Sequence, residues 1–115
     1  MTRDTPASSD NAKAQMRKGI LEFCAILIIA QGEVYASDIL QKLREADLLV
    51  VEGTLYPILS RLKNDELVSY EWRESRNGPP RKYYTLTKKG KESLKDLTGT
   101  WNALTSSITS LLDHA

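Results

Sequence analysis

Apolar and polar positions follow two different periods in the middle of the chain. Residues 52–64 place four apolar side chains at i, i+3, i+4 and i+7, which is one face of a helix: Leu55, Ile58, Leu59 and Leu62. Residues 68–73 alternate between apolar and polar side chains, the period of a half-buried strand, and residues 81–86 are a second β-rich run. The pattern predicts a helix with a polar outer face, followed directly by a two-stranded hairpin.

Residues at the ends of these segments predict how the chain turns. Asn77-Gly78 is a turn dipeptide and should connect the two strands. Val51 precedes the helix, and its side chain cannot accept a hydrogen bond from the free backbone amides, so the cap should be weaker by about 1 kcal/mol. After the helix, Asn64 or Asp65 should adopt the left-handed backbone conformation that both residue types tolerate.

The N-terminal half is predicted to form two helices. The first should run from about Asn11 to Gln31, and because its residues 20–30 are apolar almost all round, it should be buried on more than one side. That run is too short for a membrane span, which needs roughly 20 apolar residues. The polar residues 1–15 should be a disordered tail, and we expect no signal peptide. The second helix should span residues 36–45, with three inward side chains: Ile39, Leu40 and Leu43.

The last helix, which should begin after Thr87 as its N-cap and end near residue 113, carries another apolar pattern. Spacings of 3, 4, 3, 4 and 3 define a heptad seam: Leu94, Leu97, Trp101, Leu104, Ile108 and Leu111. This seam either folds back on the chain's own core or pairs with a second copy. Because three helices and a hairpin already close a core, we favour a homodimer.

The chain has 115 residues, enough for one domain, and a net charge of +1 from 16 Lys+Arg and 15 Asp+Glu, so it is not basic overall. Its cations are unevenly distributed. Between residues 72 and 91, the single acid Glu74 accompanies seven basic residues: Arg73, Arg76, Arg81, Lys82, Lys88, Lys89 and Lys91. Such a run is either a solvated surface or a phosphate-binding one, and its position on a hairpin beside a polar helix face favours phosphate.

The sequence lacks the residue patterns that an enzyme needs. Cys24 is the only cysteine and fits a small core side chain better than a redox sensor, and the only histidine is His114. We find no metal-ligand spacing, nucleophile–base pair or glycine-rich phosphate loop. We therefore expect no enzymatic activity, no metal and no cofactor. Nothing indicates an oxidising compartment, so we expect a cytoplasmic protein.

Two separate runs are specific enough to suggest a family. They are Gly53-Thr54-Leu55-Tyr56-Pro57-Ile58-Leu59 with Arg61-Leu62, and Gly78-Pro79-Pro80-Arg81-Lys82-Tyr83-Tyr84 with Leu86-Thr87 and Gly90. In order and spacing they resemble the PadR family of bacterial transcriptional regulators, over roughly residues 16–112. The resemblance implies a winged-helix DNA-binding domain, a C-terminal dimerisation helix and a repressor role. The chain departs from the family pattern at three places: Ala36-Ser37 instead of Gly-Tyr, Val51 instead of Ser or Thr, and Glu66 instead of Gly.

We therefore predict a mainly α fold with a small β-hairpin, in which residues 16–86 are a winged helix-turn-helix and residues 87–113 a dimerisation helix. The predicted function is that of a homodimeric repressor that binds a palindromic double-stranded DNA operator, with half-sites about 10 or 20 bp apart. The alternative is a protein–protein adaptor built on the same fold. Candidate DNA contacts lie on the predicted helix over residues 52–64, which would be the recognition helix, on the predicted hairpin, which would be the wing, and on the first helix. They are Arg17, Lys18, Thr54, Tyr56, Ser60, Arg61, Lys63, Arg76, Asn77, Arg81 and Lys82.

Three residues have open roles. Pro57 presses towards the carbonyl of Gly53, and either offers DNA a small, kinked surface or marks a bend forced by packing. Tyr56 either contacts DNA or braces its helix. Trp101 either fills the seam, which we favour, or lines a site for a small planar apolar effector. The resemblance supports the effector, since some short PadR-like regulators hold flat aromatic effectors at the dimer interface near a tryptophan on this helix.

Overall fold

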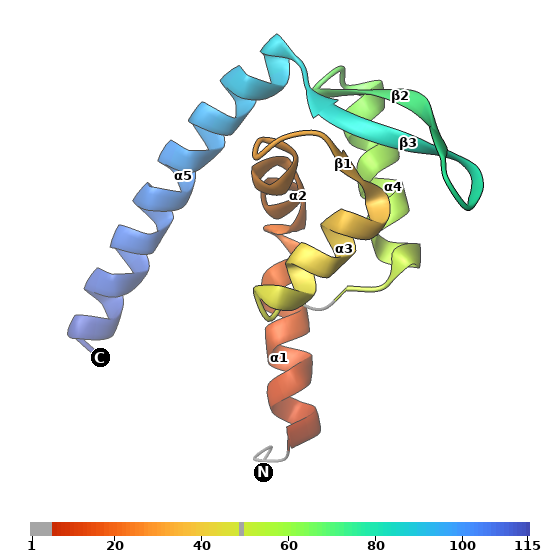
Figure 1. Cartoon of the computed structure of the whole chain (residues 1–115). Coiled ribbons are helices and arrows are strands. Elements are labelled where there is room, and N and C mark those ends of the chain that lie inside the picture. The colour runs from red at the N-terminus through yellow and green to blue at the C-terminus, as the bar shows by residue number, and fades with distance from the viewer. Residues whose placement is uncertain (1–5, 49) are drawn as a thin grey trace.

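A computed structural model describes the backbone of residues 6–48 and 50–115, and within them the side chains from Ala12 onwards. Three helices pack into a core, a β-hairpin projects from one side of it, and the first and last helices extend away from the hairpin (Figure 1). The elements in chain order are α1 (Pro6–Lys18), α2 (Leu21–Ile29), β1 (Val34–Tyr35), α3 (Ala36–Glu45), α4 (Glu52–Asn64), β2 (Val68–Ser75), β3 (Gly78–Leu86) and α5 (Lys88–Asp113). The predicted mainly α fold with a small hairpin is confirmed.

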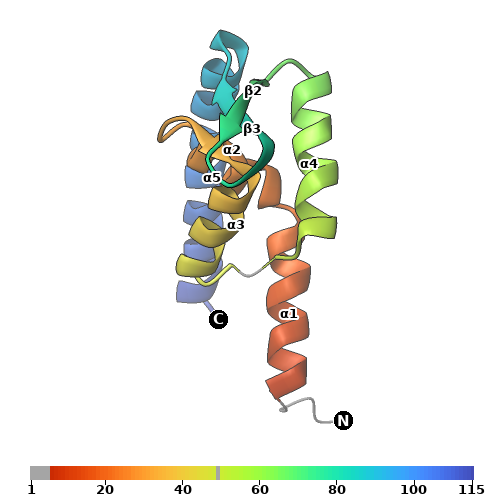
Figure 2. The same cartoon turned by 45° about the vertical axis from the view of Figure 1, so that its right-hand side comes forward.

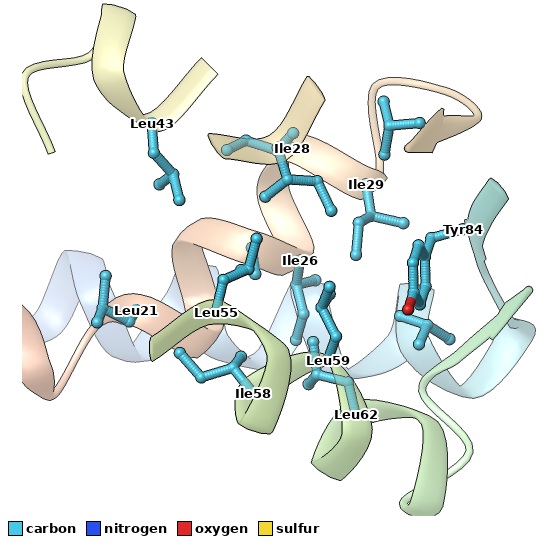
Figure 3. Packing of buried hydrophobic residues seen from close by; sticks show 14 of the residues in the cluster. Leu21, Ile26, Ile28, Ile29, Leu43, Leu55, Ile58, Leu59, Leu62 and Tyr84 are labelled. Atoms are coloured by element: carbon cyan, nitrogen blue, oxygen red, sulfur yellow. The ribbon is translucent and has the colours of Figure 1, made fainter. Parts of the chain in front are cut away.

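The core is built on the predicted faces of α3 and α4. Figure 3 shows α4 directing its apolar side chains towards α2, where Ile26 and Ile29 are almost fully buried. Ile39 and Leu43 of α3 and Val68 of β2 also belong to this core. Burying each such side chain contributes roughly 1.5–3 kcal/mol, so α4 is held firmly with its opposite, polar face outward. All four predicted apolar residues of α4 are buried: Leu55, Ile58, Leu59 and Leu62.

The hairpin belongs to a three-stranded antiparallel sheet in the order β1-β3-β2. The two-residue strand β1 pairs with β3 at Val34↔Tyr84. The sequence does not predict this strand, because a segment of two residues is too short to show an alternating pattern. Ser75 pairs with Gly78, so the turn lies at Arg76-Asn77, one residue before the predicted Asn77-Gly78. The cause is a register shift between Arg73 and Ser75, which bends the hairpin near its tip.

The predicted single helix from Asn11 to Gln31 is two helices. The break lies at Gly19-Ile20, where Ile20 N–H donates to the Arg17 carbonyl at 2.9 Å, a tighter turn than an α-helical one. Glycine costs about 1 kcal/mol in a helix, which favours the break here. It lets α2 enter the core while α1 points away from it (Figure 2). Helix α1 begins at Pro6, whereas the sequence predicts a tail as far as residue 15.

The left-handed residue after α4 is Glu66, with φ 62°, and the prediction of Asn64 or Asp65 is wrong. Helix α4 continues through Asn64. Leu67 N–H then donates to the Leu62 carbonyl at 2.9 Å, and Glu66 N–H donates to the Lys63 carbonyl at 3.0 Å. This hydrogen-bond pair is the Schellman motif, which requires the left-handed conformation at the position that Glu66 occupies.

Within the described part of the chain, none of the helices combines the length and the apolar character that a membrane crossing requires.

Candidate nucleic-acid interface

Burial of its apolar face leaves α4 with a continuous polar outer face. Five candidate contact residues on it are exposed: Thr54, Tyr56, Ser60, Arg61 and Lys63. At the start of the helix, no described side chain hydrogen-bonds to the free amides, as expected for Val51 at the cap. A Cβ atom added at Gly53 would have no atom within 4 Å outside its own stretch of helix, so this end of α4 is open to close approach by a large ligand.

Arg61 differs from the other candidates because it is paired. Its Nε lies 2.6 Å from Oε1 of Glu22 on α2, and both side chains are about half exposed. The pair braces α4 against α2 and offsets the charge that Arg61 would offer to a phosphate. Lys63 lies in the same last turn of α4, with its Nζ 5.9 Å from the ring centre of Tyr70 on β2.

The cations of the wing, which is the β2–β3 hairpin, fall into two groups. Arg73 is held by Glu33 and Glu71 and lies over the Tyr83 ring at 4.2 Å, so its charge is neutralised within the sheet. Arg81 lies 5.0 Å from the Tyr35 ring centre, and Lys82 lies 4.4 Å from that of Tyr70. Aromatic faces support these two cations without neutralising them, which leaves both charges available to an anion.

A groove of about 530 Å³ lies between α4, the wing and the start of α3. Residues from all three elements line it, including Ser37, Tyr56, Trp72, Arg81, Lys82 and Tyr84. Tyr56 is 48 % exposed on its wall, which excludes a core position for this residue. The pKa of Tyr84 is raised, mainly because the phenol is partly buried and to a smaller extent because Tyr56 and Tyr70 lie nearby. The phenol therefore stays protonated and neutral near pH 7. Sequence inspection missed Ser37, because only the fold brings the start of α3 beside the wing.

The remaining candidates lie at the tips and ends of elements. Arg76 and Asn77 are exposed at the turn of the wing. Arg17 and Lys18 end α1, where Arg17 is half-buried and Lys18 exposed.

Thr87 caps α5 as predicted, because its hydroxyl accepts a hydrogen bond from Gly90 N–H at 2.9 Å.

The heptad seam of α5 divides into two halves. Leu94 and Leu97 are partly buried against the core, and the Trp101 ring lies 6.2 Å from the Phe23 ring of α2. Beyond them the seam is exposed, by 53 % at Leu104, 56 % at Ile108 and 72 % at Leu111. The first half of the seam therefore packs on the chain's own core, as one of the two predicted arrangements requires, and the second half is exposed.

A second cleft, of about 400 Å³, lies between α2 and α5. Its lining is almost entirely apolar and includes Phe23, Cys24, Leu27, Leu48 and Trp101. Burial raises the pKa of the Cys24 thiol, which keeps it protonated and unreactive at neutral pH. Within the residues that the structure describes, no cluster of three His, Cys, Asp or Glu side chains is arranged to hold a metal ion.

Comparison with known proteins gives a consistent result. Residues 26–96 match the family described as the transcriptional regulator PadR-like family. A PadR-like transcription factor from Bacteroides fragilis is 57 % identical, and its structure matches 88 % of this chain and 98 % of its own with a TM-score of 0.74. A PadR-like transcriptional regulator from Bacillus cereus is 37 % identical, with coverages of 85 % and 96 % and a TM-score of 0.76. An uncharacterised protein from Lysinibacillus sphaericus is 26 % identical over 92 residues, which are 77 % of this chain and 84 % of the relative.

Proposed function

Since this chain belongs to the PadR-like family of transcriptional regulators, which are not enzymes, we propose that it is a homodimeric repressor that binds a palindromic DNA operator. Each protomer would insert α4 into the major groove and lay its wing along the adjacent phosphates.

The observation that carries this proposal is the polar face of α4 beside the cationic wing. The major groove of DNA is about 12 Å wide and admits one helix, and base edges there are recognised by polar side chains. Thr54, Tyr56 and Ser60 have the exposure and the chemistry for that contact. Arg81 and Lys82 are suited to the phosphates, which position a protein on DNA without reading its sequence.

The dimer is supported by the exposed second half of α5. Leu104, Ile108 and Leu111 continue the seam of a helix that spans 26 residues. Apolar residues repeated at this spacing pack well against a second helix of the same kind. A twofold axis through this seam would present two copies of α4 to successive turns of DNA, as a palindromic site requires.

The proposal also includes a small-molecule effector that binds in the apolar cleft. The apolar cleft beside Trp101 has a volume within the range of about 300–1,000 Å³ that small-molecule sites occupy. Planar apolar molecules would stack on the indole and displace water from the cleft. Because the cleft lies between α2 and α5, a ligand there would alter DNA binding if it favoured one arrangement of these helices.

The decisive test is DNA binding by the purified full chain. We would select duplexes from a random library, and then measure their affinity and that of the gene's own upstream region over a salt series. We expect selected sites with twofold symmetry, and an affinity that falls with salt in proportion to the phosphates contacted. If the protein selects no sequence and binds duplex DNA only as weakly as a neutral protein, the proposal is wrong and the adaptor function is favoured.

A further inference from the structure

The end of α4 and the start of α5 are fastened together at one compact joint, formed by Thr87 and Gly90 against the Glu66–Leu67 turn. The Thr87 hydroxyl donates to the Glu66 carbonyl at 2.6 Å and lies 3.1 Å from the Leu67 carbonyl. The same oxygen accepts from Gly90 N–H at 2.9 Å, and Thr87 N–H donates to the Leu67 carbonyl at 3.1 Å. One threonine therefore bonds to the turn that ends α4 and to the first turn of α5.

Gly90 brings the two backbones into contact at this joint. It is buried, and a Cβ atom placed on it would lie 2.0 Å from the Leu67 carbonyl oxygen and 3.1 Å from Cδ2 of Leu86. Such a separation from a backbone atom is impossible, so any side chain here would drive α5 away from the turn. The absence of a side chain thus sets how close α5 approaches the end of α4.

The turn itself has little freedom. Glu66 adopts a left-handed conformation, with φ 62°, inside the Schellman motif that ends α4. Its carbonyl is the one that accepts the 2.6 Å bond from Thr87. Further along α5, Leu94 and Leu97 pack against the core, so the helix is fixed at its base and along its first turns. The recognition helix and the seam helix consequently behave as one body.

We propose that this joint sets the distance between the two recognition helices of the dimer, and with it the operator half-site spacing that the protein accepts. The inference rests on the proposed homodimeric, DNA-binding function. Helix α5 is about 39 Å long at 1.5 Å per residue, and its exposed seam lies in the far half. A small change of angle at Gly90 is therefore magnified at the seam, and through the twofold axis it displaces both copies of α4.

The test measures the distance between the two copies of α4 directly. The parent is the full chain with Cys24→Ala and Glu52→Cys, which places one nitroxide label at the exposed start of α4 in each protomer. Pulsed electron spin resonance then gives the distribution of label–label distances in the dimer. The variants are Thr87→Val, which removes the hydroxyl, Thr87→Ser, which keeps it, and Gly90→Ala. Gly99→Ala is the matched control, since an added Cβ there meets no atom within 4 Å and lies on the side of α5 opposite the seam.

We expect one narrow distance for the parent, Thr87→Ser and Gly99→Ala, and a broader distribution for Thr87→Val. Gly90→Ala should move the mean distance by about 2 Å or more, because the joint must open by about 1 Å and the long helix magnifies the change. On selected operators whose half-site spacing is altered by one base pair, the parent should lose about tenfold in affinity and Thr87→Val clearly less, since its α4 pair is less rigid.

The outcomes separate the two proposals. If Thr87→Val is folded and dimeric but has the parent's distance distribution and spacing preference, the joint is only a helix cap and the inference is overturned. Thr87→Val decides the matter even if Gly90→Ala fails to fold. If the parent itself gives no label–label distance and is monomeric by light scattering, the homodimer is refuted instead.

Discussion

Nη1 of Arg73 on β2 lies 2.5 Å from Oε2 of Glu33, which precedes β1. The guanidinium group reaches this carboxylate across the central strand β3, where it covers the Tyr83 ring at 4.2 Å. Glu71 holds the same guanidinium group from β2 itself. The most strongly paired cation of the wing therefore braces the sheet, while its neighbours Arg81 and Lys82 keep their charges for a ligand.

This division predicts how wing variants respond to salt. Arg81→Ala and Lys82→Ala should each weaken binding to all DNA sequences similarly, and reduce the slope of log affinity against log salt by about one. Arg73→Gln is the matched control and should leave that slope unchanged, because its charge is already neutralised by Glu33 and Glu71. Fluorescence anisotropy over a salt series measures all three. If the slope of log affinity against log salt is unchanged in both Arg81→Ala and Lys82→Ala, the wing does not contact the DNA phosphates.

The Glu33–Arg73 pair also predicts a dependence of stability on pH. The hydrogen bond from Arg73, aided by its charge, lowers the pKa of the Glu33 carboxyl below its ordinary value of 4.5. A lowered pKa means that the pair stabilises the folded state fully above pH 4.5, and that this contribution is lost as pH falls through the lower, folded-state value. Thermal unfolding followed between pH 3 and pH 7 should show a smaller acid dependence for Glu33→Gln than for the unmodified chain. Equal acid dependence would show that the pair contributes nothing measurable.

The left-handed residue predicts a stabilising substitution. Glu66→Gly should raise the free energy of unfolding by about 1 kcal/mol, because glycine adopts a positive φ without the steric cost that a side chain incurs. Asp65→Gly is the control: its φ is −82°, so glycine there adds only freedom to the unfolded chain and should destabilise the protein. Chemical denaturation measures both. A loss of stability for Glu66→Gly would mean that its side chain contributes more than the backbone conformation costs.

The exposed seam predicts the assembly of the protein. Ile108→Glu should give a monomer by light scattering, since it places a charge in the centre of the apolar seam. Truncation after Leu97 should do the same, or leave an insoluble chain, and operator affinity should collapse because each half-site then binds alone. Ser106→Glu, on the opposite side of α5, is the control and should remain dimeric. A folded Ile108→Glu variant that stays dimeric and binds its operator normally would contradict the proposed interface.

The position of Trp101 beside the apolar cleft predicts that the cleft binds planar hydrophobic compounds. In a Trp72→Phe background, where Trp101 is the only tryptophan, planar hydrophobic compounds should quench its fluorescence in a saturable way. Trp101→Leu should abolish that binding, measured by titration calorimetry because no tryptophan remains, while leaving DNA affinity intact. If no compound quenches the fluorescence of Trp101, and Trp101→Leu still gives a stable dimer with normal DNA binding, then Trp101 serves only to pack the seam.

The sequence by itself determined the elements whose side chains repeat with a clear period. The buried face of α4, the bounds of α3 and the existence of the hairpin follow from the spacing of apolar residues, because burial imposes that spacing over several turns. The Thr87 cap and the weak Val51 cap follow from side-chain chemistry that acts within one turn. These features depend on residues close together in the chain, so the chain alone reveals them.

Only the tertiary structure decided which polar residues meet across the fold. The ion pairs Arg73–Glu33 and Arg61–Glu22 join elements that are far apart in sequence. The spacing of apolar residues along the chain does not indicate such contacts. The place of Ser37 beside the wing, the division of the α5 seam and the contact of Gly90 with Leu67 have the same origin. Each depends on how closely two separate elements approach, which is fixed by the packing of the whole core and not by any one stretch of residues.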